Sequence, residues 1–229
     1  MTEPQSLHAR RLFGRRKGWK LRPHQAGLLD TMLPELALVL REGGDPKSYF
    51  TAPIDDVWLE IGFGAGEHLA WQADQNPRVG ILGAEPFEAG MAKLLSKLAL
   101  APTGNVRLYT EDARDILTAL PDASLGRIFI LFPDPWPKTR HHKRRFIQTE
   151  MLDELARVLR PGAELRFATD HASYLEYALE RLMAHTSFAW TAQRAEEWKT
   201  RPSDWPPTRY EGKAIEVGRP CAYFIFRRV

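Results

Sequence analysis

Residues 57–66 carry the sequence VWLEIGFGAG, and this stretch is the clearest indication of architecture in the chain. Strand-like residues 57–61 lead into Gly62, Gly64 and Gly66, and residues 67–75 then have the pattern of a helix. Such a strand, glycine turn and helix is typical of a parallel α/β sheet, where glycines let the backbone come close to a ligand. A tight strand-to-helix connection that binds nothing is the alternative.

Apolar runs of strand length alternate with amphipathic, helix-length segments beyond this turn. Seven strands are predicted, at residues 57–61, 79–84, 106–109, 128–132, 165–168, 188–192 and 222–227. A helix is predicted at residues 146–159, and Pro161-Gly162 is expected to stop it. We therefore expect an α/β, Rossmann-like fold with helices on both faces of a seven-stranded, mostly parallel sheet, and a C-terminal antiparallel hairpin.

Length and composition suit one sizeable domain plus an extension, since the chain has 229 residues and 44% hydrophobic content. We expect a basic N-terminal extension with a helix at residues 1–50 and the sheet-bearing domain at residues 51–229. Cys221 is the single cysteine, so a disulfide within the chain is excluded and a reducing cytoplasm is the expected location. No apolar run approaches the roughly 18 residues of a membrane span, so we expect a soluble protein without a membrane partner.

Basic residues form two clusters, although the net charge is only +3. The cations of the first cluster are Arg10, Arg11, Arg15, Arg16, Lys17, Lys20 and Arg22, and those of the second lie in the run RHHKRR at residues 140–145. Two separated clusters favour a polyanion such as nucleic acid, and we expect the N-terminal arm to become ordered on RNA. A solvated tail that only aids solubility is the alternative for the first cluster.

Acidic residues stand at the ends of three predicted strands. Glu60 ends the first strand, and Glu85 follows the second, where doubly wound folds place the carboxylate that binds ribose hydroxyls. Asp112 follows the strand at 106–109 and would meet an adenine edge from the same crevice. This arrangement permits either a nicotinamide dinucleotide or S-adenosylmethionine.

The glycine turn distinguishes these two ligands. A dinucleotide site needs Gly-x-Gly-x-x-Gly so that the helix N-terminus reaches a pyrophosphate, whereas Gly66 comes one residue early. Glu60 would repel a pyrophosphate but suits the ammonium and sulfonium charges of the methyl donor. The sequence therefore predicts S-adenosyl-L-methionine as the cofactor, bound by Glu60, Gly62, Gly64, Gly66, Glu85 and Asp112.

The run FPDPWPK at residues 132–138 places Asp134 just past the carboxyl end of a strand, where open α/β sheets bind their ligands. Its three prolines fix their own φ and should hold the residues before them extended. Asp134 and Trp136 would therefore be presented rigidly. Trp136 could stack on an extruded base, or it could pack against its own domain.

Several motifs occur together in one order: FGRRKG at residues 13–18, EIGFGAG at 60–66, FPDPWPK with its HHKRR tail, and TRYE at 208–211. With them the chain resembles the bacterial tRNA (guanine-N7-)-methyltransferases over nearly its whole length. The resemblance implies a class I, S-adenosylmethionine-dependent enzyme. It further implies methylation of N7 of the variable-loop guanine at position 46 of tRNA, which gives 7-methylguanosine.

The resemblance also implies roles for single residues. Asp134 would be the catalytic residue and would also contact the donor. The positions that match the family's substrate-binding residues are Lys138, Asp170, Thr208, Arg209, Tyr210 and Glu211, and those that match its RNA-contacting tract are Arg140, His141, His142, Lys143, Arg144 and Arg145. From the residues alone, Asp170 could instead cap the helix after it, and Glu211 could be a surface residue.

The chemistry of guanine N7 suits this set of residues. N7 has a free lone pair and needs no general base, so the protein must align the reactants and stabilise the positive charge that develops on the purine. A carboxylate such as Asp134 can do the second and can also accept hydrogen bonds from guanine N1–H and N2–H. Adjacent His141 and His142 would point about 100° apart in a helix, so we expect no metal. We expect tRNA as the partner and a monomer or weak homodimer.

Two other classes of function stay open. An amino-methyltransferase for adenine has an Asp/Asn-Pro-Pro-aromatic loop, which Asp134-Pro135-Trp136 resembles in part. The spacing argues against this class, because Trp136 takes the place of the second proline. A non-catalytic RNA-binding module on the same fold is the other class, and the intact acids at the strand ends argue against it.

Overall fold

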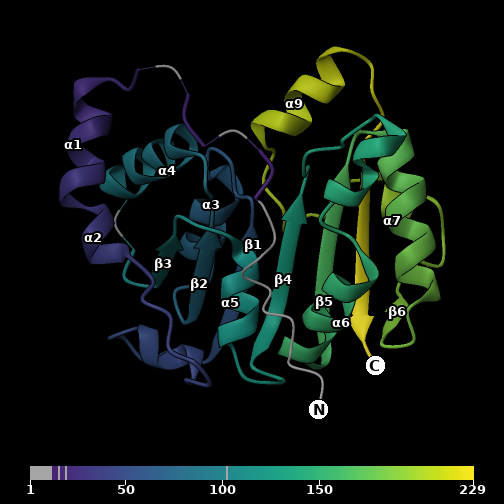
Figure 1. Cartoon of the computed structure of the whole chain (residues 1–229), viewed down its shortest axis with the longest axis horizontal. Helices are drawn as coiled ribbons and strands as arrows, with labels where there is room; N and C mark the ends of the chain where they lie inside the picture. The colour runs from purple at the N-terminus through teal and green to yellow at the C-terminus, as the bar shows by residue number, and fades with distance from the viewer. Residues whose placement is uncertain (1–11, 15, 19, 102) are drawn as a thin grey trace.

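A seven-stranded sheet lies at the centre of the computed structural model, which describes residues 12–14, 16–18, 20–101 and 103–229 (Figure 1). The strands run in the order β3-β2-β1-β4-β5-β7-β6. Their bounds are β1 (Asp56–Ile61), β2 (Val79–Ala84), β3 (Val106–Tyr109), β4 (Leu125–Leu131), β5 (Leu159–Thr169), β6 (Phe188–Trp190) and β7 (Ala222–Arg228). Neighbours from β3 to β5 are parallel, whereas β7 is antiparallel to both β5 and β6. The predicted fold is confirmed.

The strand order reverses between β1 and β4, because β2 and β3 extend to one side of this pair and β5 to the other. Loops that leave the carboxyl ends of two such strands diverge and leave a crevice between them. The glycine turn follows β1 and the proline-rich loop follows β4. Both motifs therefore meet at this crevice.

Helices cover both faces of the sheet (Figure 1). In the described ranges they are α1 (Pro23–Thr31), α2 (Leu33–Leu36), α3 (Glu67–Gln75), α4 (Glu88–Leu100), α5 (Ala113–Ala119), α6 (Thr149–Val158), α7 (Ala172–Ala184), α8 (Glu196–Lys199) and α9 (Arg209–Glu216), with the 3₁₀ helices η2 (Pro46–Tyr49) and η3 (Thr139–Arg144). Val57 and Leu59 of β1 pack in the core with α5, α6 and α7, whereas Trp58 packs with α3 and α4. Since side chains alternate along a strand, Glu60 points to the side of α3.

The helix predicted at residues 146–159 is α6, which begins at Thr149 and ends at Val158. The prediction that Pro161-Gly162 stops it is wrong, because β5 already starts at Leu159 and contains both residues. Gly162 has a φ of 82°, and the pairing between β4 and β5 is irregular near this point. A local irregularity in the sheet therefore accommodates the pair, which a regular strand would exclude.

The N-terminal part of the chain packs on the sheet domain. Helix α1 lies against α4, and the backbone N–H of Leu38 donates to the carbonyl of Leu108 at the edge strand β3 (2.8 Å). Tyr49 and Phe50 are buried in the same core as β1. Arg10, Arg11 and Arg15 of the first basic cluster lie outside the described residues. In the parts of the chain that are described, no helix has the length and apolar character that crossing a membrane requires.

Candidate active site

The turn after β1 presents backbone to the crevice. Gly62, Gly64 and Gly66 have φ angles of 72°, 57° and 72°, in the left-handed region that favours glycine. Gly66 is also the N-cap of α3, and a Cβ there would lie 2.6 Å from Leu94 Cδ1. The turn therefore needs glycine for its conformation and packing, and the same residues let a ligand approach the backbone.

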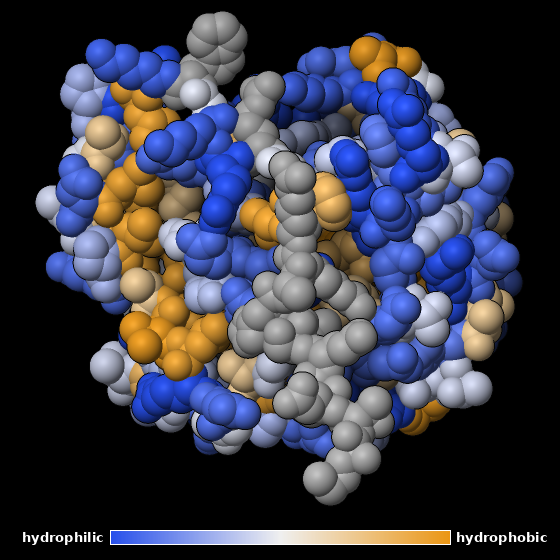
Figure 2. Space-filling view, viewed as in Figure 1, coloured by the Kyte–Doolittle hydropathy of each residue, from blue (hydrophilic) through white to orange (hydrophobic). Residues whose placement is uncertain are grey.

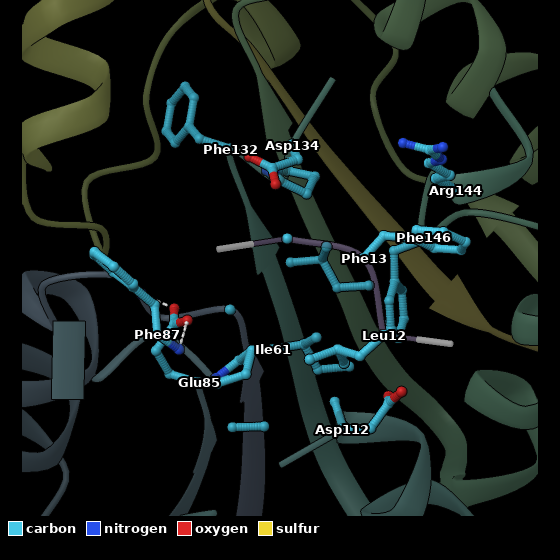
Figure 3. A pocket seen from close by; sticks show the side chains of 18 of the residues that line it. Leu12, Phe13, Ile61, Glu85, Phe87, Asp112, Phe132, Asp134, Arg144 and Phe146 are labelled. Atoms are coloured by element: carbon cyan, nitrogen blue, oxygen red, sulfur yellow. Dashed lines mark hydrogen bonds between the residues drawn. The ribbon is translucent and has the colours of Figure 1, made fainter. Parts of the chain in front are cut away.

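A cavity of about 390 Å³ opens at this crevice (Figure 3). The glycine turn, the ends of β2 and β3 and the proline-rich loop all contribute to its wall. The predicted site residues that line it are Gly62, Gly64, Glu85, Asp112, Asp134, Arg144 and Tyr210. Its volume falls in the range of small-molecule sites, about 300–1,000 Å³. Three of the predicted strand-end acids, Glu85, Asp112 and Asp134, therefore converge on one cavity.

Backbone hydrogen bonds fix Glu85 in the wall of this cavity (Figure 3). Its Oε2 accepts from the N–H of Gly64 (2.7 Å), and its Oε1 accepts from the N–H of Phe87 (2.9 Å). Burial raises the pKa of the Glu85 carboxyl above its usual value, and the two backbone hydrogen bonds oppose this shift. A ligand hydroxyl would thus meet a carboxylate whose position is already set.

Asp112 enters the cavity wall as a helix cap. Its Oδ1 accepts from the backbone N–H of Arg114 (3.0 Å) at the start of α5, and its carboxylate also pairs with the Arg114 guanidinium. Asp is among the favoured N-cap residues, so the sequence suits a helix start at this position. The carboxylate lies in the cavity wall beyond β3, as the sequence predicted.

Two residues of the proline-rich loop depart from the expected extended backbone. Phe132 has a φ of 50° and Trp136 a φ of 43°, a region that bulky residues seldom adopt. The expectation that the following prolines hold both residues extended is therefore wrong. Arg145 holds the loop instead: its Nε donates to the carbonyl of Pro135 (2.9 Å), and its terminal nitrogens donate to Ser173 (2.8 and 2.7 Å). Strained backbone of this kind clusters at functional sites.

Asp134 projects from this loop into the cavity (Figure 3). Within the described part of the chain, no group donates a hydrogen bond to its carboxylate. The side chain is exposed toward the cavity, but the surrounding walls withhold enough water to raise the pKa of the Asp134 carboxyl above its usual value. The Asp134 carboxylate is thus an acceptor directed at any ligand in the cavity.

Aromatic and cationic side chains gather beside Asp134. The Phe13 ring meets Trp136 edge to face at 6.3 Å, and the Arg144 guanidinium lies 4.6 Å from the Phe13 ring centroid and 4.9 Å from that of Trp136. All three residues line the cavity. Of the two roles that the sequence left open for Trp136, packing against its own chain is seen, and a cavity-facing position is seen as well.

The predicted RNA-contacting residues fall into two groups. Arg140 and Lys143 are exposed, and the half-buried members of the tract are His141, His142 and Arg144. Arg145 differs, because only 2% of it is exposed and its guanidinium lies 4.8 Å from the ring centroids of Tyr174 and Tyr177. The structure therefore places Arg145 beneath the loop rather than on an RNA-facing surface. Lys138, predicted to bind substrate, is exposed just before η3.

The TRYE motif forms the start of α9, above the carboxyl edge of the sheet (Figure 1). Thr208 and Glu211 form a reciprocal capping box, and buried Glu211 also accepts from Tyr223 and from Arg201 (3.0 Å). Tyr210 lines the cavity, and a Cβ on Gly64 would lie 3.0 Å from its ring. The capping box thus fixes the helix that carries exposed Arg209 and Tyr210. Glu211 is a structural member of the motif in this arrangement.

Besides Glu211, two predicted acids lie outside the large cavity wall. Asp170 pairs with Arg219 (3.0 Å) and does not cap α7, whose N-cap is His171. Glu60 is buried, pairs with His68, and lines a small neighbouring cavity. Sequence reasoning did not assign His68 or Phe13. Phe13 opens the FGRRKG motif, which was the available signal, whereas a lone histidine on a helix gave none.

Comparisons with known proteins identify relatives of this chain. A family model described as "Putative methyltransferase" matches residues 55–223. A tRNA (guanine-N(7)-)-methyltransferase of Rhodospirillum rubrum is 51% identical over 223 residues, which cover 95% of this chain and 88% of the relative. The protein of that name from Rhizobium meliloti is 46% identical over 231 residues, with 100% of both chains covered.

Solved structures support the fold. The 16S rRNA methyltransferase KamB has a TM-score of 0.59 at 19% identity, covering 85% of this chain and 98% of its own. TrmN from Thermus thermophilus has a TM-score of 0.53 at 14% identity, covering 80% of this chain and 47% of its own. The family model spans most of the chain and the relatives span nearly all of it, so the family resemblance is confirmed. The chain belongs to the tRNA (guanine-N(7)-)-methyltransferase family.

Proposed function

We propose that this chain transfers the methyl group of S-adenosyl-L-methionine to N7 of a guanine in tRNA. The single observation that carries the proposal is the Asp134 carboxylate, which faces a cavity built from the glycine turn and two further strand-end acids. The target we propose is the variable-loop guanine at position 46, and the product is 7-methylguanosine. The tRNA name of the relatives supports this choice of substrate.

The residues present fit the methyl donor. Glu85 would accept from ribose hydroxyls, Asp112 would accept from the adenine amino group, and the backbone at Gly62 and Gly64 would lie along the ligand. Gly66 shapes the turn from behind. When bound, S-adenosyl-L-methionine supplies a methyl group that its sulfonium charge makes electrophilic. A carboxylate-rich wall suits a cationic donor, since opposite charges attract across a partly screened cavity.

Asp134 would act on the guanine. Its carboxylate can accept hydrogen bonds from N1–H and N2–H, which orients the base and rejects adenine, because adenine lacks that pair of donors. It also stabilises the positive charge that grows on the purine as N7 is methylated. One such charge about 4 Å away contributes at most roughly 4 kcal/mol, so alignment by the rigid loop must supply much of the acceleration.

The exposed cations would bind the tRNA backbone. We propose that the phosphate contacts come from Lys138, Arg140, His141, His142, Lys143 and Arg144. Arg145 would act indirectly, because it holds the proline-rich loop in place. Arg209 and Tyr210 on α9 would contact substrate from the opposite side. Thr208 and Glu211 would fix this helix through their capping box, and Asp170 would hold Arg219 by an ion pair. The division at residue 50, a cytoplasmic location and a monomer or weak homodimer stay predictions.

One assay tests the reaction and the base. The chain would be incubated with labelled donor and unmodified tRNA, and the digested product analysed by mass spectrometry. We expect 7-methylguanosine, and none from a tRNA whose variable-loop guanine is replaced by adenine. N6-methyladenosine as the product would indicate an amino-methyltransferase. Binding of donor and tRNA without transfer would indicate a non-catalytic module or a different RNA substrate.

A further inference from the structure

A row of buried polar side chains runs from the end of β1 into α3, behind the glycine turn. His68 Nδ1 lies 2.7 Å from Glu60 Oε2, and His68 Nε2 lies 3.1 Å from Gln72 Nε2. All three side chains are almost fully buried, with 2–3% exposed. The imidazole ring is also enclosed by the rings of Phe129 and Trp205, with centroids 4.5 and 6.0 Å away. Such a buried network is rigid when each member has its partner.

The partners of Gln72 determine the tautomer of His68. Gln72 Nε2 donates to the carbonyl of Asp204 (2.8 Å), and Gln72 Oε1 accepts from Asn76 Nδ2 (3.1 Å), so the amide nitrogen is the atom that faces the imidazole. An amide nitrogen can only donate, so His68 Nε2 must accept. The ring proton is then on Nδ1 and is donated to Glu60.

Glu60 uses one carboxylate oxygen, Oε2, for the bond to His68. Among the described residues, His68 is the one that hydrogen-bonds its side chain. Glu60 lines a small cavity of about 20 Å³, and three residues of its wall, Gly62, Phe132 and Tyr210, also line the large cavity. A cavity holds a water-sized group once it reaches about 10–15 Å³. The small cavity therefore suits one compact cation next to the donor site.

We propose that His68 is a positioning residue that orients the Glu60 carboxylate toward the ammonium group of the donor's methionine part. The inference rests on the proposed function and deepens it. A carboxylate in a buried wall needs hydrogen bonds to stay in one orientation, and here His68 provides the fixed one. Without that bond Glu60 can rotate toward other donors, and the ammonium group loses its acceptor.

The test uses two ligands that differ in the methionine part. S-adenosylhomocysteine carries the ammonium group, whereas 5′-methylthioadenosine keeps the adenosine and lacks it. His68→Phe retains an aromatic ring against Phe129 and Trp205 but removes the donor. We expect calorimetry to show about 10- to 100-fold weaker binding of S-adenosylhomocysteine and unchanged binding of 5′-methylthioadenosine. The matched control is His185→Phe, since His185 also faces a carboxylate, Asp153 (3.1 Å), and a phenylalanine ring.

Two further variants keep the result interpretable. His68→Asn places an amide N–H near the position of Nδ1 and should recover part of the lost affinity. Glu60→Gln should show the same selective loss, and the double variant His68→Phe/Glu60→Gln should lose little more than either alone, because both remove one interaction. In methyl-transfer kinetics His68→Phe should raise the KM for the donor far more than it lowers kcat.

Equal weakening of both ligands in His68→Phe and in His68→Asn would overturn the inference, because it would show a structural role only. Unchanged binding of S-adenosylhomocysteine would overturn it too, as would fully additive losses in the double variant. Failure of the proposed function has a different signature: the unchanged chain would bind neither ligand or transfer no methyl group, and the inference would then fail with it.

Discussion

Asp134 faces the cavity, and no residue that the structure describes donates a hydrogen bond to its carboxylate, so its replacement should affect the chemistry directly. Asp134→Asn keeps the shape of the side chain and removes its charge. We expect kcat for methyl transfer to fall at least about 100-fold, and the Kd for S-adenosylhomocysteine to rise by a much smaller factor, because Asp134 is also a predicted donor contact. Single-turnover transfer to tRNA measures the first and calorimetry the second. Asp122→Asn, which removes an exposed carboxylate beside Arg157, is the control and should retain full activity.

The pH dependence should report the same carboxylates. Burial raises the pKa values of Asp134 and Glu85, and both groups are expected to act as ionised acceptors. The active, ionised forms are therefore present at neutral pH and are lost as the pH falls through the raised values. We expect kcat/KM to decline on the acid side at pH values above the ordinary carboxyl range of about 3.9–4.3. A profile that stays flat down to that range would contradict ionised roles in a desolvated cavity.

Side-chain direction decided which residues could be assigned from sequence. Glu85, Asp112 and Asp134 each follow a predicted strand, and parallel strands bring their carboxyl ends to one edge, so their convergence was predictable. The burial of Arg145 was not, because a cation in a basic run has no local signal that turns it inward. The role of His68 depends on a partner eight residues earlier on another element. Only the packing of α3 on β1 brings the two together.

The glycine turn is the element whose integrity is easiest to test. Gly66→Ala adds a Cβ at a φ of 72°, 2.6 Å from Leu94 Cδ1, and we expect it to lower the free energy of unfolding by at least about 2 kcal/mol. Gly212→Ala in α9 is the matched control, since nothing lies within 4 Å of its new methyl group. It should be neutral or slightly stabilising, by up to about 1 kcal/mol. Urea unfolding compares the two, and equal effects would contradict the argument.

Arg145, which holds the proline-rich loop, and Arg140 on η3 should respond differently to neutralisation. Arg145→Met removes hydrogen bonds to Pro135 and Ser173, so we expect a loss of about 2–4 kcal/mol in unfolding free energy and a lower kcat. Arg140→Ala removes an exposed cation, so we expect unchanged stability and a salt dependence of tRNA binding reduced by about 1 in log–log slope.

Both variants are compared by the same three measurements. Thermal unfolding gives the stability, single-turnover kinetics give the rate of methyl transfer, and filter binding at several salt concentrations gives the salt slope. If Arg145→Met left stability intact and reduced the salt slope as Arg140→Ala does, Arg145 would contact RNA after all, as the sequence resemblance implied.

Element boundaries were predictable where local signals and tertiary contacts agree. The predicted bounds of β2, β3 and α3 are confirmed, because each has a clear apolar pattern preceded by glycine, proline or asparagine. Pro161-Gly162 is the exception. Proline and glycine usually end an element, but β4 pairs with Leu159 before them and with Glu164 after them, which extends β5 across both residues. The contribution of neighbouring strands is absent from a single segment of sequence.

The whole molecule presents a mostly hydrophilic face over α6 and α7, to one side of the crevice (Figure 2). Exposed Arg140 and Lys143 on η3 belong to the same half of the molecule, which follows β4. Arg16, Lys17, Lys20 and Arg22 come from the N-terminal segment, and Leu12, Phe13 and Gly14 of that segment line the cavity. The same segment thus carries cations of the first basic cluster and part of the cavity wall. A test of RNA binding must therefore remove the charges without removing the cavity contacts.

Neutralising the N-terminal cations in place makes that separation. In the variant Lys17→Gln/Lys20→Gln/Arg22→Gln, Arg16 stays paired with Glu111 of the cavity wall and Phe13 stays beside Trp136, so donor affinity should be unchanged. We expect weaker tRNA binding and a log–log salt slope reduced by up to about 3, since each lost phosphate contact removes somewhat less than one counterion. Deletion of residues 1–22 should reproduce this loss and also alter donor affinity, because it removes part of the cavity wall. Unchanged tRNA affinity and salt slope in both variants would show that the arm does not bind RNA, and the cations of η3 would then have to account for the electrostatic attraction alone.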